Sequence, residues 1–137
     1  MEELIYDRTL TDVLERTNKG YHNYTDLNRI EEWCEYLANL LTSYGYAVRI
    51  TVKKDWTMLD ERTETHTTRI LNNVKAIRDA FTTMSTTPAT PTSINPIDYI
   101  KANDIEKILV DINQLIINME SAWKYSGDII SGEGYMS

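Results

Sequence analysis

Hydrophobic positions recur at helical intervals in three long tracts of this chain. The first tract begins after Thr25, a favourable N-cap, and ends before Gly45, which suits a left-handed helix stop. Residues three and four apart lie on one face of a helix, so this tract is predicted to form an amphipathic helix. Its predicted apolar face contains Leu27, Ile30, Cys34, Leu37, Leu41 and Tyr44, and its predicted solvent face contains Glu31, Glu32, Glu35 and Asn39.

Two more tracts share this spacing. The second follows Thr63 or Thr65, either of which can act as the N-cap. The third begins at Asn103, and Glu106 three residues later completes a predicted capping box. This last helix is predicted to run for roughly 22 residues, or about 33 Å, close to the length of the first, so these two helices can lie side by side. Its apolar face is wide enough to contact two other helices, which suits a bundle interior. The predicted faces contain Ile70, Val74, Ile77 and Phe81 in the second tract, and Ile105, Ile108, Ile112, Leu115, Met119 and Ala122 in the third.

Shorter elements lie between these tracts. A short helix is predicted near residues 9–20, where Thr9 or Thr11 can cap. Apolar and polar residues alternate over 46–52, which predicts a strand, or else an extended segment if it finds no pairing partner. Residues 82–96 contain three prolines and form a predicted connector, long enough for the last helix to pack on its own bundle or on a neighbour.

The pattern therefore predicts a mainly α protein. We expect one helical domain over 1–137, a bundle of three main helices plus the short N-terminal helix, and one isolated strand or extended segment near 46–52. A Thr/Pro connector at 82–96 precedes the last helix, and a Gly/Ser tail at 126–137 follows it. A chain of 137 residues is long enough to bury its own core.

Charge and cysteine content exclude several classes of function. The net charge of −7 and a pI near 4.8 repel phosphate backbones and anionic lipids, so neither nucleic acid nor a membrane is an expected partner. The single cysteine, Cys34, cannot form an internal disulfide, which indicates a reducing compartment. The acidic start lacks the basic region of a secretory signal, and no apolar run reaches the roughly 18 residues of a membrane span.

The chain contains no recognisable catalytic motif. His66 lies near Asp60, Glu61 and Glu64, which suggests a metal or acid–base cluster, but residues two apart on a helix do not face each other. These residues are expected instead to serve the helix N-terminus, where acids are favourable. Cys34 belongs to an apolar face and is expected to be an inert thiol. We therefore expect no enzymatic activity, no metal and no cofactor.

Three tryptophans are candidate contact residues. Trp33 and Trp123 lie beside apolar faces and are expected to pack in the core. Trp56 lies in the turn sequence KKDWT, and it is equally suited to covering one end of the bundle or to binding a partner.

The chain also resembles a recurring module of phage and prophage structural genes of Firmicutes, which are typically tail or baseplate associated. The resemblance runs in order from Asp7 onward, through YTDLNRIEEWCEYL, the alternating segment with KKDWT, and RILNNVKAIRDAF before the connector. It is densest in the last helix and the YSGDIISGE that follows. The residues that carry it there are Tyr99, Ala102, Asn103, Ile105, Glu106, Leu109, Asp111, Leu115, Ile116, Met119 and Trp123.

This resemblance implies a non-enzymatic structural or accessory protein that mediates protein–protein contacts in the virion tail or its assembly. Its expected partners are other phage structural subunits, in a homo-oligomer or a hetero-assembly, and its expected location is the virion, with the host cytoplasm during assembly. An alternative is a carbohydrate-binding module of a tail fibre that contacts the host surface. A third possibility is a small enzyme or metal protein acting through His66. The expected partner-binding residues are Trp56, Tyr125, Ser126, Gly127, Ile129, Ile130 and Gly132.

Overall fold

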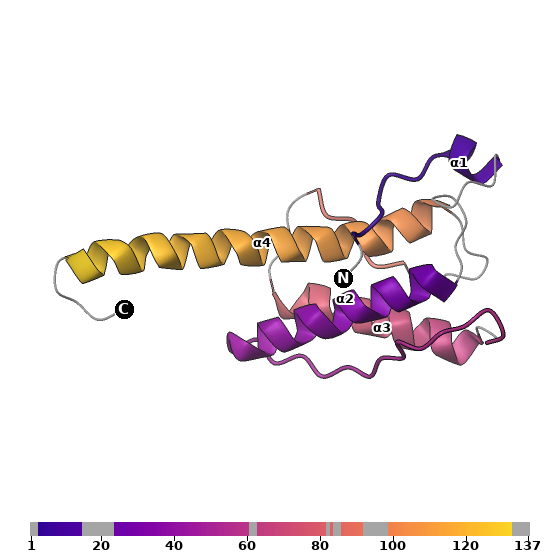
Figure 1. Cartoon of the computed structure of the whole chain (residues 1–137), viewed down its shortest axis with the longest axis horizontal. Coiled ribbons are helices and arrows are strands. Elements are labelled where there is room, and N and C mark those ends of the chain that lie inside the picture. The colour runs from indigo at the N-terminus through magenta and orange to yellow at the C-terminus, as the bar shows by residue number, and fades with distance from the viewer. Residues whose placement is uncertain are drawn as a thin grey trace.

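The computed structural model is a helical bundle from which one long helix projects (Figure 1). Its helices are α1 (Leu10–Leu14), α2 (Tyr24–Ser43), α3 (Glu64–Ala80) and α4 (Tyr99–Gly132). The structure describes residues 3–14, 24–60, 63–81, 83, 86–91 and 99–132. Helices α2, α3 and the first half of α4 pack against one another, which confirms the prediction of a mainly α bundle with three main helices.

The core forms where the three predicted apolar faces meet. Leu37 and Leu41 of α2, Val74 of α3, and Ile108 and Ile112 of α4 have no or almost no exposed surface. Burying each such side chain stabilises the fold by about 1.5–3 kcal/mol relative to exposure. The hydrophobic spacing in the sequence is therefore the main determinant of how these helices face one another.

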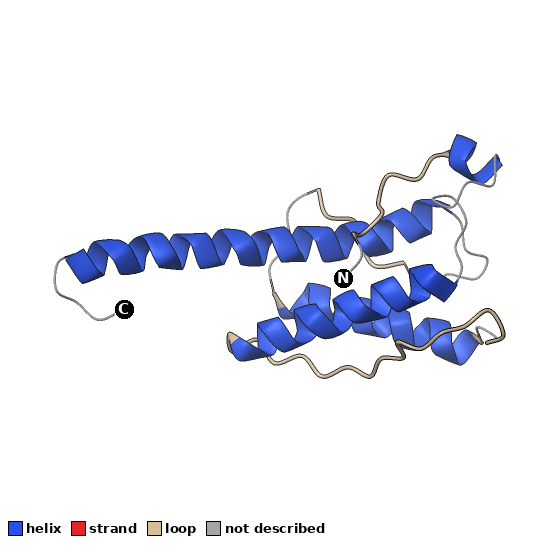
Figure 2. Cartoon of the chain, in the orientation of Figure 1, coloured by secondary structure: helices blue, strands red, loops and turns tan. Residues whose placement is uncertain are grey.

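The predicted strand is absent from the described part of the chain (Figure 2), and residues 46–57 instead form an extended segment beside α2 and α3. Among the described residues, no strand lies alongside this segment, and side chains bond to its main chain instead. The Thr51 carbonyl accepts hydrogen bonds from Arg69 and Asn73, both at 2.7 Å. The Thr42 hydroxyl bonds to both main-chain groups of Val48. The extended-segment alternative is confirmed, and the strand is not.

Three helix ends follow the predicted signals, but α2 begins at Tyr24, so Thr25 lies inside the helix and the prediction that it is the N-cap is wrong. Thr63 caps α3, and the His66 side chain accepts a hydrogen bond from the Thr63 main-chain N–H, completing a capping box. Thr9 and Asp12 form reciprocal bonds at the start of α1. Gly45 ends α2 with a φ of +93°, a conformation that glycine adopts without strain.

Helix α4 differs from its prediction at both ends. It begins at Tyr99, so Asn103 lies inside the helix and is not its N-cap. It continues to Gly132, so the prediction that a Gly/Ser tail begins at residue 126 is wrong for 126–132. A single glycine such as Gly127 costs a helix about 1 kcal/mol but does not by itself end it. Residues 133–137 of the predicted tail lie outside the described residues.

The connector returns the chain to its own bundle. Of residues 82–96, the structure describes 83 and 86–91, and these are not helical. The Thr87 hydroxyl donates to Asp111 of α4 at 2.7 Å, and Arg78 of α3 donates to the Pro88 carbonyl at 3.0 Å. The sequence allowed α4 to pack either on its own bundle or on a neighbouring chain. In the structure, it packs on helices of the same chain.

Candidate protein–protein contact site

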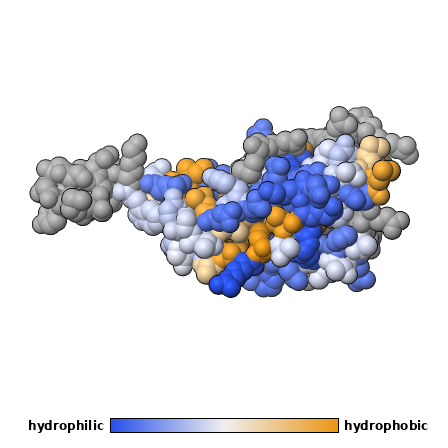
Figure 3. Space-filling model, turned by 60° about the horizontal axis from the view of Figure 1, so that its bottom comes forward, coloured by the Kyte–Doolittle hydropathy of each residue, from blue (hydrophilic) through white to orange (hydrophobic). Residues whose placement is uncertain are grey.

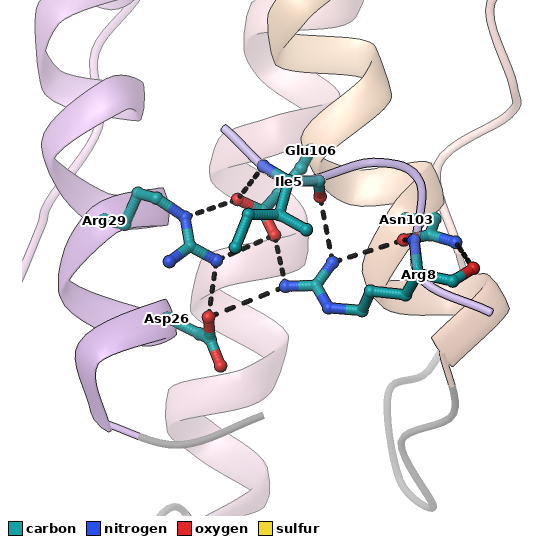
Figure 4. Close-up of polar contacts among 6 residues, drawn as sticks. All are labelled: Ile5, Arg8, Asp26, Arg29, Asn103 and Glu106. Carbon is teal, nitrogen blue, oxygen red and sulfur yellow. Dashed lines mark hydrogen bonds and ion pairs between the residues drawn. The ribbon is translucent and has the colours of Figure 1, made fainter. Parts of the chain in front are cut away.

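A buried network of ion pairs fixes the N-terminal arm, residues 3–9, across α2 and α4 (Figure 4). Its centre is Glu106, which has no exposed surface. Glu106 accepts hydrogen bonds from Arg8 at 2.6 Å, from Arg29 at 2.6 and 3.0 Å, and from the main-chain N–H of Ile5 at 3.1 Å. Asp26 also pairs with Arg29. We call Arg8, Asp26, Arg29, Asn103 and Glu106 the Glu106 network.

Asn103 completes this network from the preceding turn of α4. Its side-chain oxygen accepts from the main-chain N–H of Arg8 at 3.0 Å, and its amide donates to the Arg8 carbonyl at 2.9 Å. The prediction that Asn103 and Glu106 form a capping box is therefore wrong. The residues are three apart on one face of α4, as predicted, but they bind the N-terminal arm and Arg29 rather than their own helix.

The acidic residues of this network act on the pKa of Arg29. Burial by itself would lower the pKa of Arg29, but the hydrogen bonds and negative charges of Glu106 and Asp26 outweigh it and raise the pKa above its ordinary value. Both guanidinium groups and both carboxylates have partners, so the network offers no free group for acid–base chemistry. Its role in the bundle is structural.

A second polar network attaches the extended segment to the bundle. We call Asn28, Glu31, Lys53, Trp56 and Arg69 the Glu31 network. Glu31 is only 1% exposed, so the prediction that it faces solvent is wrong. Its carboxylate accepts hydrogen bonds from the Trp56 indole N–H, from the Arg69 guanidinium and, at 3.0 Å, from the main-chain N–H of Lys53. Asn28 forms a pair of hydrogen bonds with the main chain of Trp56 at 2.8 and 3.0 Å.

Trp56 is therefore a core residue rather than a binding residue. Its side chain is 3% exposed, and its ring lies edge-on to His66 at 5.0 Å between centroids. A ring covered in this way cannot stack on a ligand without leaving the core. Of the two predicted roles for Trp56, the structure supports covering one end of the bundle.

Cys34 lies in the hydrophobic core, and His66 belongs to the capping box of α3. Cys34 is 1% exposed, and burial raises the pKa of its thiol, with the charge of Glu31 adding to the effect. A thiol in this environment is protonated at neutral pH and is a poor nucleophile. Within the described ranges, no three His, Cys, Asp or Glu side chains are grouped so that they could hold a metal ion.

The C-terminal half of α4 projects from the bundle, and its described side chains are largely exposed. Among the side chains of α4 that the structure describes, which end at Trp123, Ile116 is the last that is fully buried, and Ile117 and Trp123 are 43% and 50% exposed. Figure 1 shows the helix continuing past the ends of α2 and α3. Tyr44 at the end of α2 supports the start of this projection, because its ring packs edge-on against Trp123 and its hydroxyl donates to Glu120.

Six of the predicted contact residues lie on this projection. Tyr125, Ser126, Gly127, Ile129, Ile130 and Gly132 all belong to α4, and their side chains lie outside what the structure describes. The structure thus brings them together on one helix rather than on an extended tail. Trp123 was expected to pack in the core, but half of its surface is exposed at the base of the projection.

Comparison with known proteins identifies no relative, because no family model, curated protein or solved structure matches this chain. In the part of the chain that the structure describes, no helix has both the length and the apolar character required to cross a bilayer.

Proposed function

We propose that this protein is a non-enzymatic phage or prophage structural or accessory protein that mediates protein–protein contacts in the virion tail or its assembly. The observation that carries the proposal is the projection of α4 beyond α2 and α3, with Ile117 and Trp123 exposed where it leaves the bundle. The resemblance to phage and prophage tail-associated modules supports the virion as its location and other structural subunits as its partners.

A helix that projects alone is an inefficient way to stabilise a monomer. In proteins, most helical stability comes from packing an apolar face against other elements, and an isolated helix of this length is marginal in water. The apolar positions of α4 continue at intervals of three and four through Leu115, Met119 and Ala122, and Trp123 lies beside them. This continuation supports a helix that completes its packing on another subunit, as amphipathic helices do in grooves.

The rest of the visible surface offers a weaker case for contact. On the face drawn in Figure 3, hydrophobic surface occurs as small patches separated by hydrophilic residues. Scattered apolar residues are ordinary on soluble proteins, whereas contiguous patches mark interfaces. The carbohydrate-binding alternative requires Trp56 and neighbouring tyrosines to form an accessible aromatic surface, and the burial of Trp56 weakens it.

Truncation tests the role of the projection. A stop codon after Lys124 removes residues 125–137 but retains the contacts of Tyr44 with Glu120 and Trp123. We expect its thermal unfolding, followed by circular dichroism, to match that of the full chain. In phage particles purified from a host that expresses the gene, the full chain should co-purify with tails and the truncated chain should be absent.

A surface substitution away from the projection provides the matched control. Leu59 is 95% exposed in the turn after Trp56, so Leu59→Ser should leave both stability and incorporation unchanged. Equal incorporation of the truncated chain would contradict a docking role for α4, and absence of the full chain from particles would contradict the virion proposal itself.

A further inference from the structure

The N-terminal arm is held in the way that a protein holds a separate peptide (Figure 4). Two of its side chains, four positions apart, act as anchors, since Leu4 is buried in the hydrophobic core and Arg8 reaches Glu106 at 2.6 Å. Side chains of α4 also bond to the main chain of the arm, at 3.1 Å for Glu106 and the Ile5 N–H. Asn103 bonds to both main-chain groups of Arg8, at 3.0 and 2.9 Å. We call the surface formed by the α2 and α4 residues of the Glu106 network the arm cleft.

The arm cleft requires a positive charge from its occupant. Glu106 has no exposed surface and Asp26 is 3% exposed, so both carboxylates are buried. Of the two guanidinium groups that pair with them, Arg29 belongs to α2, whereas Arg8 belongs to the arm. Without the arm, the described residues of the cleft would bury one more negative charge than positive charge, which is unfavourable. A segment that fits this cleft must therefore supply a cation in the place of Arg8.

The surroundings of the arm leave room for it to move. A cavity of about 560 Å³ lies along the arm, lined by residues 3–7 and by side chains of the first two turns of α2, so the arm is not tightly packed on this side. Helix α1, which follows the arm, lies apart from α2 and α3 in Figure 1, and its Leu10 and Leu14 are 56% and 71% exposed. The bundle therefore holds the arm through the contacts of the arm itself rather than through α1.

The chain between the arm and α2 is long enough to reach a second copy. Residues 10–23 separate the two in sequence, and with α1 kept helical they can span roughly 35 Å. An arm bound to another copy makes the same ion pairs and main-chain bonds as an arm bound to its own chain. Exchange of an identical segment is for this reason a low-cost route to dimers.

From these observations we propose that the arm cleft binds the N-terminal arm of a second copy of this chain, so that two subunits exchange arms. In the exchanged pair, Leu4 of each subunit enters the core of the other, and Arg8 pairs with Glu106 of the other. The occupant is specified by an apolar side chain and a cation four positions later, both of which the arm supplies. This contact is separate from the projection of α4 and does not depend on the function proposed for it.

Fluorescence anisotropy can detect binding of a separate arm to the full chain. The probe is a fluorescein-labelled, C-terminally amidated peptide of residues 1–9, MEELIYDRT. The receiving chain is Arg8→Glu, whose own arm would bury a third carboxylate beside Glu106 and Asp26 and is therefore released. We expect this chain to bind the peptide saturably, and the unmodified chain to bind it at least about tenfold more weakly, because its own arm competes at a high effective concentration. Peptides that carry Arg8→Glu or Leu4→Asn should not bind.

A matched control and a second receiving chain complete this assay. Arg49→Glu makes the same change of charge at an exposed position outside the arm cleft, and it should bind the peptide as weakly as the unmodified chain does. Leu4→Asn in the full chain removes the other anchor of the arm without adding a negative charge, and it should bind the peptide as Arg8→Glu does. Circular dichroism verifies that each variant retains its helices.

The unmodified chain provides a readout that depends on no substitution. After refolding at high protein concentration, size-exclusion chromatography with light scattering should show a dimer. Excess free arm peptide, present during refolding, should suppress this dimer. A dimer joined through α4 should instead be insensitive to the peptide, so failure of the α4 proposal and failure of this one give different results.

Three outcomes would overturn the inference. They are equal binding of the original and Arg8→Glu peptides, no binding to receiving chains that retain their helices, and a refolded protein without a dimer that the peptide suppresses. Peptide binding without such a dimer would assign the arm cleft to a similar segment of another protein instead.

Discussion

Replacing Glu106 by glutamine should remove a large share of the stability of the fold. Glu106 has no exposed surface and accepts hydrogen bonds from Arg8, Arg29 and the main chain of Ile5. Glutamine has nearly the same shape and helix propensity, so the change mainly removes the negative charge. Its amide group would also present hydrogen-bond donors to guanidinium groups that have only donors to offer.

The expected cost follows from the burial of both partners. The side chain of Arg8 is fully buried and that of Arg29 is 4% exposed, so neither cation can regain water without moving. Removing one partner of a buried ion pair typically costs about 3–5 kcal/mol. Domains have total stabilities of about 5–15 kcal/mol, so we expect Glu106→Gln to lose roughly a third or more of the total.

Urea denaturation followed by circular dichroism measures this cost. With a slope of about 2 kcal/mol per molar urea, a loss of about 4 kcal/mol lowers the midpoint by about 2 M. Glu120→Gln is the matched control, since Glu120 is exposed and its described partner is the Tyr44 hydroxyl. We expect this control to lower the midpoint by less than about 0.5 M.

A double variant separates the loss of the pair from the loss of packing. In Arg29→Met with Glu106→Leu, neither a cation nor an anion of that pair remains buried. The double variant should therefore be less destabilised than the sum of its two single variants. The reasoning would be refuted if Glu106→Gln behaved like the Glu120→Gln control, or if the two single effects were additive.

Three further substitutions test the local structure. Gly45→Ala should destabilise the fold by about 1 kcal/mol, because φ is +93° there, and an unchanged melting temperature would exclude a requirement for glycine. Trp56→Phe removes the indole donor to buried Glu31 and should lower the free energy of unfolding by about 1–3 kcal/mol, whereas an effect below 0.5 kcal/mol would show the bond to be dispensable. Because burial raises the pKa of Cys34, stability should fall as pH rises above the ordinary thiol pKa of about 8.5, by up to about 1.4 kcal/mol per pH unit. Cys34→Ala should remove this part of the alkaline loss in urea titrations, and an identical pH profile for the two proteins would contradict it.

The bundle was predictable because its signal is repeated. Each long helix presents several apolar residues at intervals of three and four, and one misplaced position does not change which face is buried. The cap at Thr63 and the stop at Gly45 were also predictable, because each depends on local geometry. The end of α4 was not predictable in this way, since Gly127 and its neighbours are compatible with either a helix or a turn.

Both polar networks were missed because their partners are far apart in sequence. Glu31 has the residue type of a solvent-facing position, and only the approach of Trp56 and Arg69 makes it a buried acceptor. A local signal did exist, because Asp26 and Arg29, and likewise Asn103 and Glu106, are three apart beside apolar positions. Polar pairs in such places can mark a buried network as well as a helix cap.

The contact surfaces were predicted in part. Sequence reasoning located expected contact residues in the C-terminal stretch, and the structure places them on a projecting helix, but the contacts themselves remain a prediction.

The ion pair between Arg8 and Glu106 affects when the bundle can close during synthesis of the chain. These two residues are 98 positions apart, so a nascent chain on the ribosome displays Arg8 and Arg29 long before their acid has been translated. Until α4 leaves the exit tunnel, Asp26 is the one acid of the network that has been made, and the arm lacks its contacts with Asn103 and Glu106. Closure of the bundle therefore waits until α4 has been made, rather than proceeding helix by helix.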